Sequence, residues 1–333
     1  MTTTITRQMP HGSRILGIGS YRPARQVPNS EIGRLCGVST DWIESRTGVV
    51  SRRFASPEDT LTTMATAAGR DACAHAGIAP DEIDCVILTT TSDLTQVPPR
   101  APEVSYLIGT HRAPAYDLSC ACPGFCYALG TASYHIRSGT ARHALIIATE
   151  RMSDITNLTD PNTAPLCADG AAAVVIGASP TTGISPMVWG SDGSHTDAVR
   201  MTCSWGQFLA DPALASPTLT MNGAQVWRWV RHDVVAGIQR IVKTAGADLA
   251  DVRVFIPHQA NGRIIDMLVE RLTLPADTVV ARDIVHSGNT SSASVPLAMA
   301  HVLAQGRAAS GDLALLVGFG AGLSFAGQMV TLP

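Results

Sequence analysis

The sequence predicts a layered α/β protein assembled from two copies of one unit. Short apolar runs alternate with Ala-rich stretches of helical character, and this alternation is typical of layered α/β folds. Two features recur at an offset of 169 residues: segment 76–88 parallels segment 245–257, and segment 145–147 parallels 314–316. We therefore predict a duplicated unit whose two copies pack into one pseudo-symmetric body.

The boundary between the copies is expected near residue 180, because residues 179–183 supply turn chemistry. This boundary gives an N-terminal half at 1–180 and a C-terminal half at 181–333. A chain of 333 residues agrees with about two such units.

The predicted strands are short apolar runs bounded by turn residues. A run such as 144–148, apolar throughout, is typical of a strand buried on both faces. The expected strands cover residues 14–19, 83–91, 115–119, 143–149, 171–177, 252–257, 279–284, 313–319 and 325–331. A helix is expected over 56–75, with Ser56 as its cap, Pro57 in its first turn and Gly77 at its end.

The composition excludes several classes of protein. Charged residues make up 15% of the chain, its net charge is −3, and it has no long Lys/Arg block, so we expect neither a nucleic-acid surface nor a membrane-binding patch. No apolar run approaches the roughly 20 residues needed to cross a bilayer. The first 14 residues lack the apolar core of a signal peptide. We therefore expect a cytoplasmic protein whose eight cysteines are thiols. Abundant Ala and Gly predict close packing of helices on sheets.

Cys122 stands between an expected strand and an expected helix. Pro123 suits a first helical position, so Cys122 falls at or beside the N-cap, where unpaired N–H groups and the helix dipole favour a thiolate. One interpretation is an activated nucleophile, and another is a small buried hydrophobe. Zinc binding together with Cys120 and Cys126 is the weakest interpretation, because their spacing fits no standard zinc pattern.

Two further polar segments follow expected strands. His258 comes just after the strand at 252–257, at the kind of strand end where active groups of α/β sheets collect, although a structural histidine also fits there. Asn261 is explained at least as well by capping the next helix as by contacting a ligand. Asn289 carries an amide donor in a turn, and His286 nearby competes with His258 as the catalytic imidazole.

The glycine-rich segment 318–322 does not predict a dinucleotide site. The residues after it look like a strand, whereas a dinucleotide-binding motif requires a helix there. A glycine turn between two strands instead lets backbone N–H groups approach a reacting carbonyl closely.

Taken together, these segments resemble the β-ketoacyl-acyl-carrier-protein synthase III family of thiolase-like condensing enzymes. The chain is also similar to the priming synthases of aromatic polyketide pathways. The resemblance covers nearly the whole chain and rests on the motifs at 41–48 (DWIESRTG), 117–125 (DLSCACPGF), 168–170 (ADG), 257–261 (PHQAN), 288–291 (GNTS) and 318–322 (GFGAG). It implies a five-layered α-β-α-β-α body formed by the two halves.

The resemblance also implies the chemistry. Cys122 would be acylated by an acyl-CoA primer, with His258 and Asn289 as its partners, and the backbone N–H groups of Cys122 and Ala321 would form the oxyanion hole. Malonyl-acyl carrier protein would then lose CO₂, and its carbanion would attack the acyl-enzyme to start a fatty-acid or polyketide chain. Neither a metal nor an organic cofactor is implied.

Further residues receive roles from the resemblance alone. The expected CoA-binding residues are Trp42, Arg46, Asn261 and Arg263; the expected acyl-pocket residues are Val97, Cys167 and Phe319; the expected carrier-docking residues are Arg228, Arg263 and Arg271. Pro161 stands where many members carry a CoA-contacting Arg, and Ala224 where many carry an Asn. Cys167 and Val97 replace bulkier residues, which predicts a longer or branched primer. A homodimer is implied, with Val97 near the partner subunit.

Two other functions remain open at this point. One keeps the acyl-Cys122 step but passes the acyl group to an alcohol or amine, which has less use for His258 and Asn289. The other is a catalytically silent partner subunit, against which the presence of Cys122 argues.

Overall fold

Two five-stranded sheets form the framework of the chain in the computed structural model, which describes residues 12–211 and 213–333. The first sheet has the order β1-β7-β6-β4-β5, with β1 at Gly12–Tyr21, β4 at Cys85–Thr89, β5 at Ala115–Asp117, β6 at His143–Arg151 and β7 at Asp169–Ser179. The second has the order β12-β11-β13-β14-β8, with β8 at Val188–Ser191, β11 at Val254–Pro257, β12 at Val279–Val280, β13 at Leu313–Gly320 and β14 at Ser324–Thr331.

The two sheets repeat one strand arrangement. In the first sheet β4 is parallel to β5 and β6, and β7 joins β6 to β1 through antiparallel pairing. In the second sheet β11 is parallel to β12 and β13, and β14 joins β13 to β8 in the same antiparallel way. The segments that repeat in the sequence lie on β4 and β11 and on β6 and β13, so the predicted duplication is confirmed. The assignment of 1–180 and 181–333 as separate domains stays a prediction.

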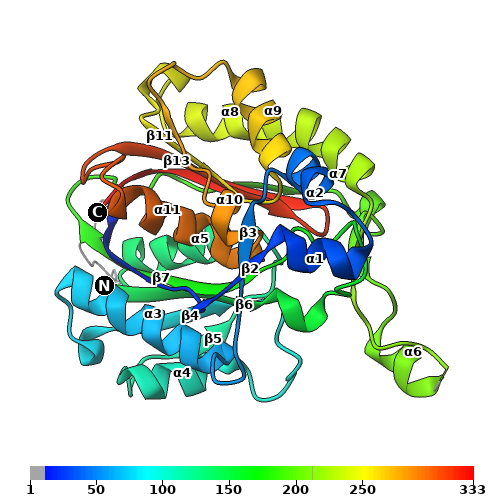
Figure 1. Cartoon of the computed structure of the whole chain (residues 1–333). Helices are drawn as coiled ribbons and strands as arrows, with labels where there is room; N and C mark the ends of the chain where they lie inside the picture. The colour runs from blue at the N-terminus through cyan, green and yellow to red at the C-terminus, as the bar shows by residue number, and fades with distance from the viewer. Residues whose placement is uncertain (1–11, 212) are drawn as a thin grey trace, which may run out of the picture.

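Helices cover both sheets and also separate them (Figure 1). The outer helices α3 (Leu61–Ala76) and α4 (Arg100–Ile108) pack on the first sheet, and α8 (Val235–Thr244) and α9 (Gly262–Leu272) pack on the second. Between the sheets lie α5 (Gly124–Arg137) and α11 (Ser294–Ala304), whose apolar side chains join both sheets in one core cluster. The resulting order of helix, sheet, helix, sheet and helix is the predicted five-layered body.

The small residues allow the layers to pack closely, as their abundance predicts. A side chain at Gly17 or Gly19 of β1 would collide with the backbone of α3 at Ala72 or Ala68. Helix α3 therefore lies directly against the strand. Such close contact increases the apolar surface that is removed from water.

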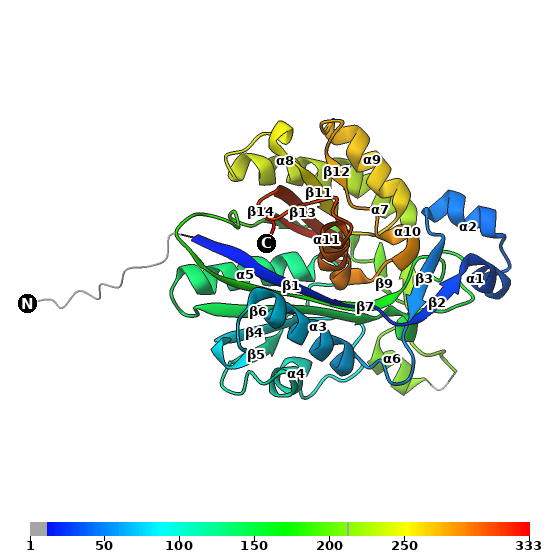
Figure 2. The ribbon, with the colours of Figure 1, turned by 60° about the vertical axis from the view of Figure 1, so that its left-hand side comes forward.

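The remaining elements lie at the margins of the two sheets. Figure 2 shows α1, α2 and the β2–β3 pair together at one end of the body, and Figure 1 shows α6 projecting from it. Their bounds are β2 Arg25–Pro28, α1 Asn29–Cys36, α2 Thr40–Thr47, β3 Ser51–Phe54, β9 Val199–Met201, α6 Trp205–Ala210, β10 Leu219–Met221, α7 Gly223–Trp229 and α10 Ile284–Ser287. Within residues 12–211 and 213–333, no helix has the length and apolar character that crossing a membrane requires.

Some predicted element boundaries are wrong. Helix α3 begins at Leu61 rather than at residue 56, because Thr60 caps it by accepting a hydrogen bond from the Thr63 N–H at 3.1 Å. Ser56 instead begins a turn that the Asp59 N–H closes. The helix ends before Gly77, as predicted. The predicted strand at 279–284 forms only β12, and α10 begins at its last residue.

Candidate active site

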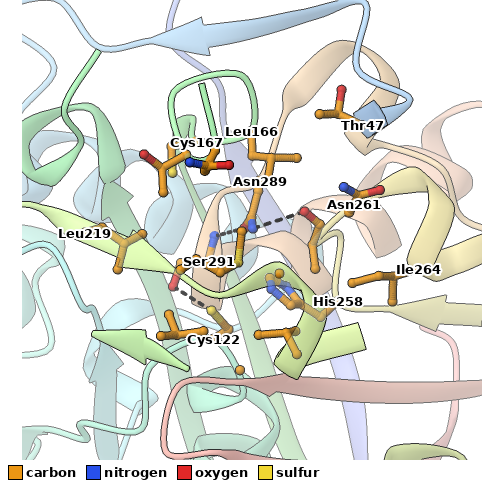
Figure 3. A pocket seen from close by; sticks show the side chains of 18 of the residues that line it. Thr47, Cys122, Leu166, Cys167, Leu219, His258, Asn261, Ile264, Asn289 and Ser291 are labelled. Atoms are coloured by element: carbon orange, nitrogen blue, oxygen red, sulfur yellow. Dashed lines mark hydrogen bonds between the residues drawn. The ribbon is translucent and has the colours of Figure 1, made fainter. Parts of the chain in front are cut away.

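A cavity of about 460 Å³ contains the three residues expected to perform the chemistry. Cys122, His258 and Asn289 all line it, although they come from three distant parts of the chain (Figure 3). The lining includes the exposed Arg46 and Arg263 as well as the buried His258, so the cavity extends from the surface into the core. His286 lies exposed on α10, and neither it nor Cys120 lines the cavity.

Cys122 lies in the connection from β5 to α5, one residue before the N-cap Pro123. The turn between β13 and β14 faces its sulfur. Gly320 has no room for a side chain there, because a Cβ would lie 2.8 Å from the Cys122 Sγ. The backbone N–H groups of Cys122 and Ala321 donate toward the sulfur, and the Ser291 Oγ lies 3.5 Å from it. Four polar groups thus meet at this point.

The ionisation of Cys122 differs from the expectation. Burial raises the pKa of its thiol to about 11, although the hydrogen bonds from Ser291 and from the two backbone N–H groups act in the opposite direction. The carboxylate of Glu150 raises the pKa further. A position beside a helix N-terminus therefore does not produce a resting thiolate, because desolvation of the charged sulfur outweighs it.

His258 lies directly after β11, where its backbone N–H bonds the Val317 carbonyl at 2.7 Å. Its Nδ1 lies 2.6 Å from the Ser294 Oγ, which also accepts the Gln259 backbone N–H at 3.2 Å. Among the described residues, the Ser294 hydroxyl has no acceptor other than this ring nitrogen. The hydroxyl therefore donates to Nδ1, which assigns the imidazole proton to Nε2.

The His258 ring is buried, with 2% of its surface exposed. Burial lowers the pKa of the imidazole to about 3. The edge of the ring faces Phe319, with 5.3 Å between the ring centroids. His258 is consequently a neutral ring at physiological pH, able to donate one hydrogen bond from Nε2.

Asn289 is held by its own backbone and by its side-chain oxygen. Its N–H bonds the Leu166 carbonyl at 2.7 Å, and its carbonyl accepts the Ala168 N–H at 3.0 Å. The Oδ1 atom accepts the Ser291 N–H at 2.9 Å, while Nδ2 donates to the Ala260 carbonyl at 3.4 Å. This arrangement fixes which end of the amide is the donor, and one Nδ2 hydrogen remains for a ligand in the cavity.

All four expected CoA-binding residues line the same cavity: Trp42, Arg46, Asn261 and Arg263. The Arg46 guanidinium lies 5.7 Å from the centre of the Trp42 ring. Asn261 caps α9 by accepting the Arg263 N–H at 2.9 Å, and its Nδ2 donates to the Arg46 carbonyl at 3.2 Å. Both interpretations of Asn261, helix cap and cavity wall, are therefore compatible. Pro161 and Ala224 also line the cavity.

The expected acyl-pocket residues separate into two groups. Cys167 and Phe319 line the cavity and are buried. Val97 does not line it, and 83% of its surface is exposed in this chain. Within one chain, then, Val97 is not part of the pocket wall. The sequence did not identify Met152 and Leu219, two apolar residues that lie on this wall.

The three expected docking arginines do not all line one depression. Arg263 and Arg271 border a second, smaller depression, where Asp266, Glu270 and the unpredicted Arg231 also lie. Arg228 is exposed but is not part of its lining. Among residues 12–211 and 213–333, no three His, Cys, Asp or Glu side chains form a group that could hold a metal ion.

Two polar residues of the site were not predicted from the sequence. Ser291 belongs to the motif at 288–291, but a serine at this position does not by itself predict contact with the Cys122 sulfur. Glu150 follows the apolar run 144–148 in β6 and is completely buried. A lone acidic residue at the end of a buried strand was an available signal.

The fold indicates the class of protein independently of the chemistry of the site. Its paired sheets and five layers are those of thiolase-like proteins. Family models agree: residues 116–193 match "3-Oxoacyl-[acyl-carrier-protein (ACP)] synthase III" and residues 242–332 match its C-terminal model. The chain therefore belongs to the 3-oxoacyl-acyl-carrier-protein synthase III family, whose members are also named β-ketoacyl-acyl-carrier-protein synthase III.

Individual relatives support this membership. The chain is 46% identical to a β-ketoacyl-[acyl-carrier-protein] synthase III of Streptomyces lividans, over 96% of this chain and 95% of the relative. It is 45% identical to a mycobacterial β-ketoacyl-[acyl-carrier-protein] synthase III of Mycobacterium avium, over 97% of each. A solved structure, the priming β-ketosynthase from the R1128 polyketide biosynthetic pathway, is similar with a TM-score of 0.97 and 44% identity, over 99% of each chain.

Proposed function

We propose that this protein is a condensing acyltransferase that joins an acyl-CoA primer to malonyl-acyl carrier protein and so initiates a fatty-acid or polyketide chain. Membership of the family supports the reaction class. The observation that carries the assignment to residues is the meeting of Cys122, His258 and Asn289 in one cavity. A thiol, a neutral imidazole donor and an amide donor suit this reaction.

In the first half-reaction Cys122 attacks the thioester carbonyl of the primer. The carbonyl oxygen becomes an oxyanion, which the N–H groups of Cys122 and Ala321 stabilise. The C–S bond to CoA then breaks, and CoA leaves as its thiol with the proton that Cys122 has lost. The primer is now bound to the enzyme as a thioester.

In the second half-reaction the malonyl thioester oxygen accepts hydrogen bonds from His258 Nε2 and Asn289 Nδ2. As CO₂ departs, these donors stabilise the enolate that forms on that oxygen. The carbanion attacks the acyl-Cys122 carbonyl, the sulfur leaves as a thiolate, and it then takes up a proton from water to restore the thiol. Because side chains and backbone amides serve each step, the proposed mechanism uses no metal or organic cofactor.

The proposed binding roles follow the cavity and its surroundings. Trp42, Arg46, Asn261 and Arg263 would contact CoA, and the positive side chains of Arg228, Arg263 and Arg271 would meet an acidic carrier protein. We also propose a cytoplasmic homodimer, in which Val97 of a second copy would reach the primer. The names of the relatives, which refer to the acyl carrier protein, support the choice of partner.

The two donors favour condensation over transfer of the acyl group to an alcohol or amine. Such a transfer needs a base to activate its acceptor, but burial holds the pKa of His258 at about 3. A donor that is neutral at working pH suits an enolate instead. The presence of Cys122 in the cavity argues against a catalytically silent subunit.

Intact-protein mass measurement tests the proposal directly. The purified protein is incubated with a panel of CoA thioesters, then with malonyl-acyl carrier protein. We expect a mass gain equal to one acyl group, followed by its loss and the appearance of a β-ketoacyl carrier protein. Loss of the adduct to an added alcohol or amine, without CO₂ release, would favour the acyltransferase instead; no adduct with any primer would argue for a silent subunit.

Primer choice provides a separate prediction. Exchange of Cys167 for Phe adds bulk to the cavity wall and should lower the use of longer or branched primers, relative to acetyl-CoA, by about tenfold or more. Exchange of Val97 for Phe should do the same only if a second copy carries this side chain to the pocket. The measurement is kcat/KM for each primer with both variants. An unchanged preference in the Cys167 variant would remove Cys167 from the acyl pocket.

A further inference from the structure

Ser291 has an unusual backbone conformation, and its side chain lies close to the proposed nucleophile. Its φ of +46° lies in the left-handed region, which residues other than glycine rarely adopt. The residue is buried, and its hydroxyl donates to the Cys122 Sγ over 3.5 Å (Figure 3). Its backbone N–H holds the Asn289 Oδ1 at 2.9 Å. One strained residue therefore serves two of the three proposed catalytic groups.

A buried carboxylate keeps this turn in place. Glu150 Oε1 accepts the Ser292 hydroxyl at 2.6 Å and the Ser292 N–H at 3.3 Å. Its Oε2 accepts the N–H groups of Thr91 and Ser92, at 2.9 and 3.2 Å, and the Ser92 hydroxyl at 2.7 Å. Because the residue after Ser291 is tied to two strand ends of the first sheet, the turn cannot relax without losing these bonds. Strain of this kind persists only where the surroundings fix it.

The charged and titratable groups around Cys122 give its thiolate no support. His258 is neutral, Cys167 has a pKa that burial raises to about 12, and the Glu150 carboxylate disfavours a second negative charge. In the described chain, the only side-chain hydrogen bond to the sulfur comes from Ser291. The two backbone N–H groups near the sulfur have another task in the proposed mechanism, since they hold the oxyanion of the substrate.

We propose that Ser291 is a further catalytic residue, whose hydroxyl donates to the Cys122 sulfur each time that sulfur carries negative charge. This occurs when the thiolate attacks the primer and again when the sulfur leaves the condensed product. No bond to Ser291 forms, and its proton stays on oxygen. The inference rests on the proposed role of Cys122 as the nucleophile.

The test is the pH dependence of Cys122 alkylation by iodoacetamide, followed by peptide mass mapping. The variant is Ser291→Gly, because glycine adopts a φ of +46° without strain and retains the N–H that holds Asn289. The substitution removes the hydroxymethyl side chain and leaves the backbone N–H in place. Ser133→Ala is the matched control, since Ser133 is another buried serine, and its hydroxyl bonds Ser13 at 2.8 Å outside the cavity.

We expect Ser291→Gly to slow alkylation of Cys122 roughly ten- to a hundredfold at pH 8, the usual effect of a hydrogen bond to a charged group. The pH–rate profile should move to higher pH, and acylation by acyl-CoA should slow by a similar factor. The Ser133→Ala profile should match the wild type. A wild-type profile in Ser291→Gly, or an equal change in Ser133→Ala, would overturn the proposal. Failure of the proposed function appears differently, as wild-type protein that iodoacetamide alkylates but no acyl-CoA acylates.

Discussion

Replacement of Cys122 by alanine is expected to abolish formation of the acyl-enzyme. The Cys122 sulfur lies beside the backbone N–H groups that would stabilise the oxyanion, so primer use should fall at least about a thousandfold without it. The measurement is the intact mass after treatment with acyl-CoA, together with the overall rate of condensation. The side chain borders a cavity, so we expect little change in the thermal unfolding midpoint.

Cys120→Ala provides the matched control for this variant. Cys120 lies two residues before Cys122 but does not line the cavity, and burial raises the pKa of its thiol as well. The control should acylate like the wild type. An acyl adduct that persists in Cys122→Ala and disappears in Cys120→Ala would identify Cys120, rather than Cys122, as the nucleophile.

Replacement of His258 by alanine is expected to separate the two half-reactions. Acylation should continue, because a ring whose pKa is about 3 is a poor base for the thiol. Release of CO₂ from the malonyl thioester should fall about a hundred- to a thousandfold, the usual effect of removing one oxyanion donor. The measurements are the acyl mass adduct and the CO₂ released, taken on the same preparation.

His286→Ala is the control for the second experiment, because this exposed histidine lies outside the cavity. It should leave both steps unchanged. If His258→Ala instead lost acylation and CO₂ release to the same extent, the proposed division of labour would be wrong. His258 would then also be required for activating the sulfur.

The fold was predictable because its signal is local and repeated. The apolar runs that become β4 and β11, or β6 and β13, carry the same pattern twice, and each copy confirms the other. Element ends were less predictable, because capping depends on single hydrogen bonds. Thr60 and Ser56 are both suitable caps by residue type, and only the turn that Asp59 closes decides between them.

The site was predictable where a residue type implies its own role. A cysteine before a helix, and a histidine and an asparagine after strands, could be identified from the sequence and from the family resemblance. The raised pKa of Cys122 could not, since it depends on burial from all sides. Nor could the contact of Ser291 with the sulfur, which requires a backbone conformation that Glu150 maintains from another part of the chain.

The high pKa of Cys122 has a consequence for the enzyme at rest. Because burial raises the pKa of Cys122 to about 11, the resting sulfur is a neutral thiol at neutral pH. Peroxides and electrophilic metabolites attack thiolates far faster than thiols, so the idle nucleophile is protected from oxidative damage. The burial that makes the Cys122 sulfur hard to ionise thus also keeps it chemically stable between turnovers.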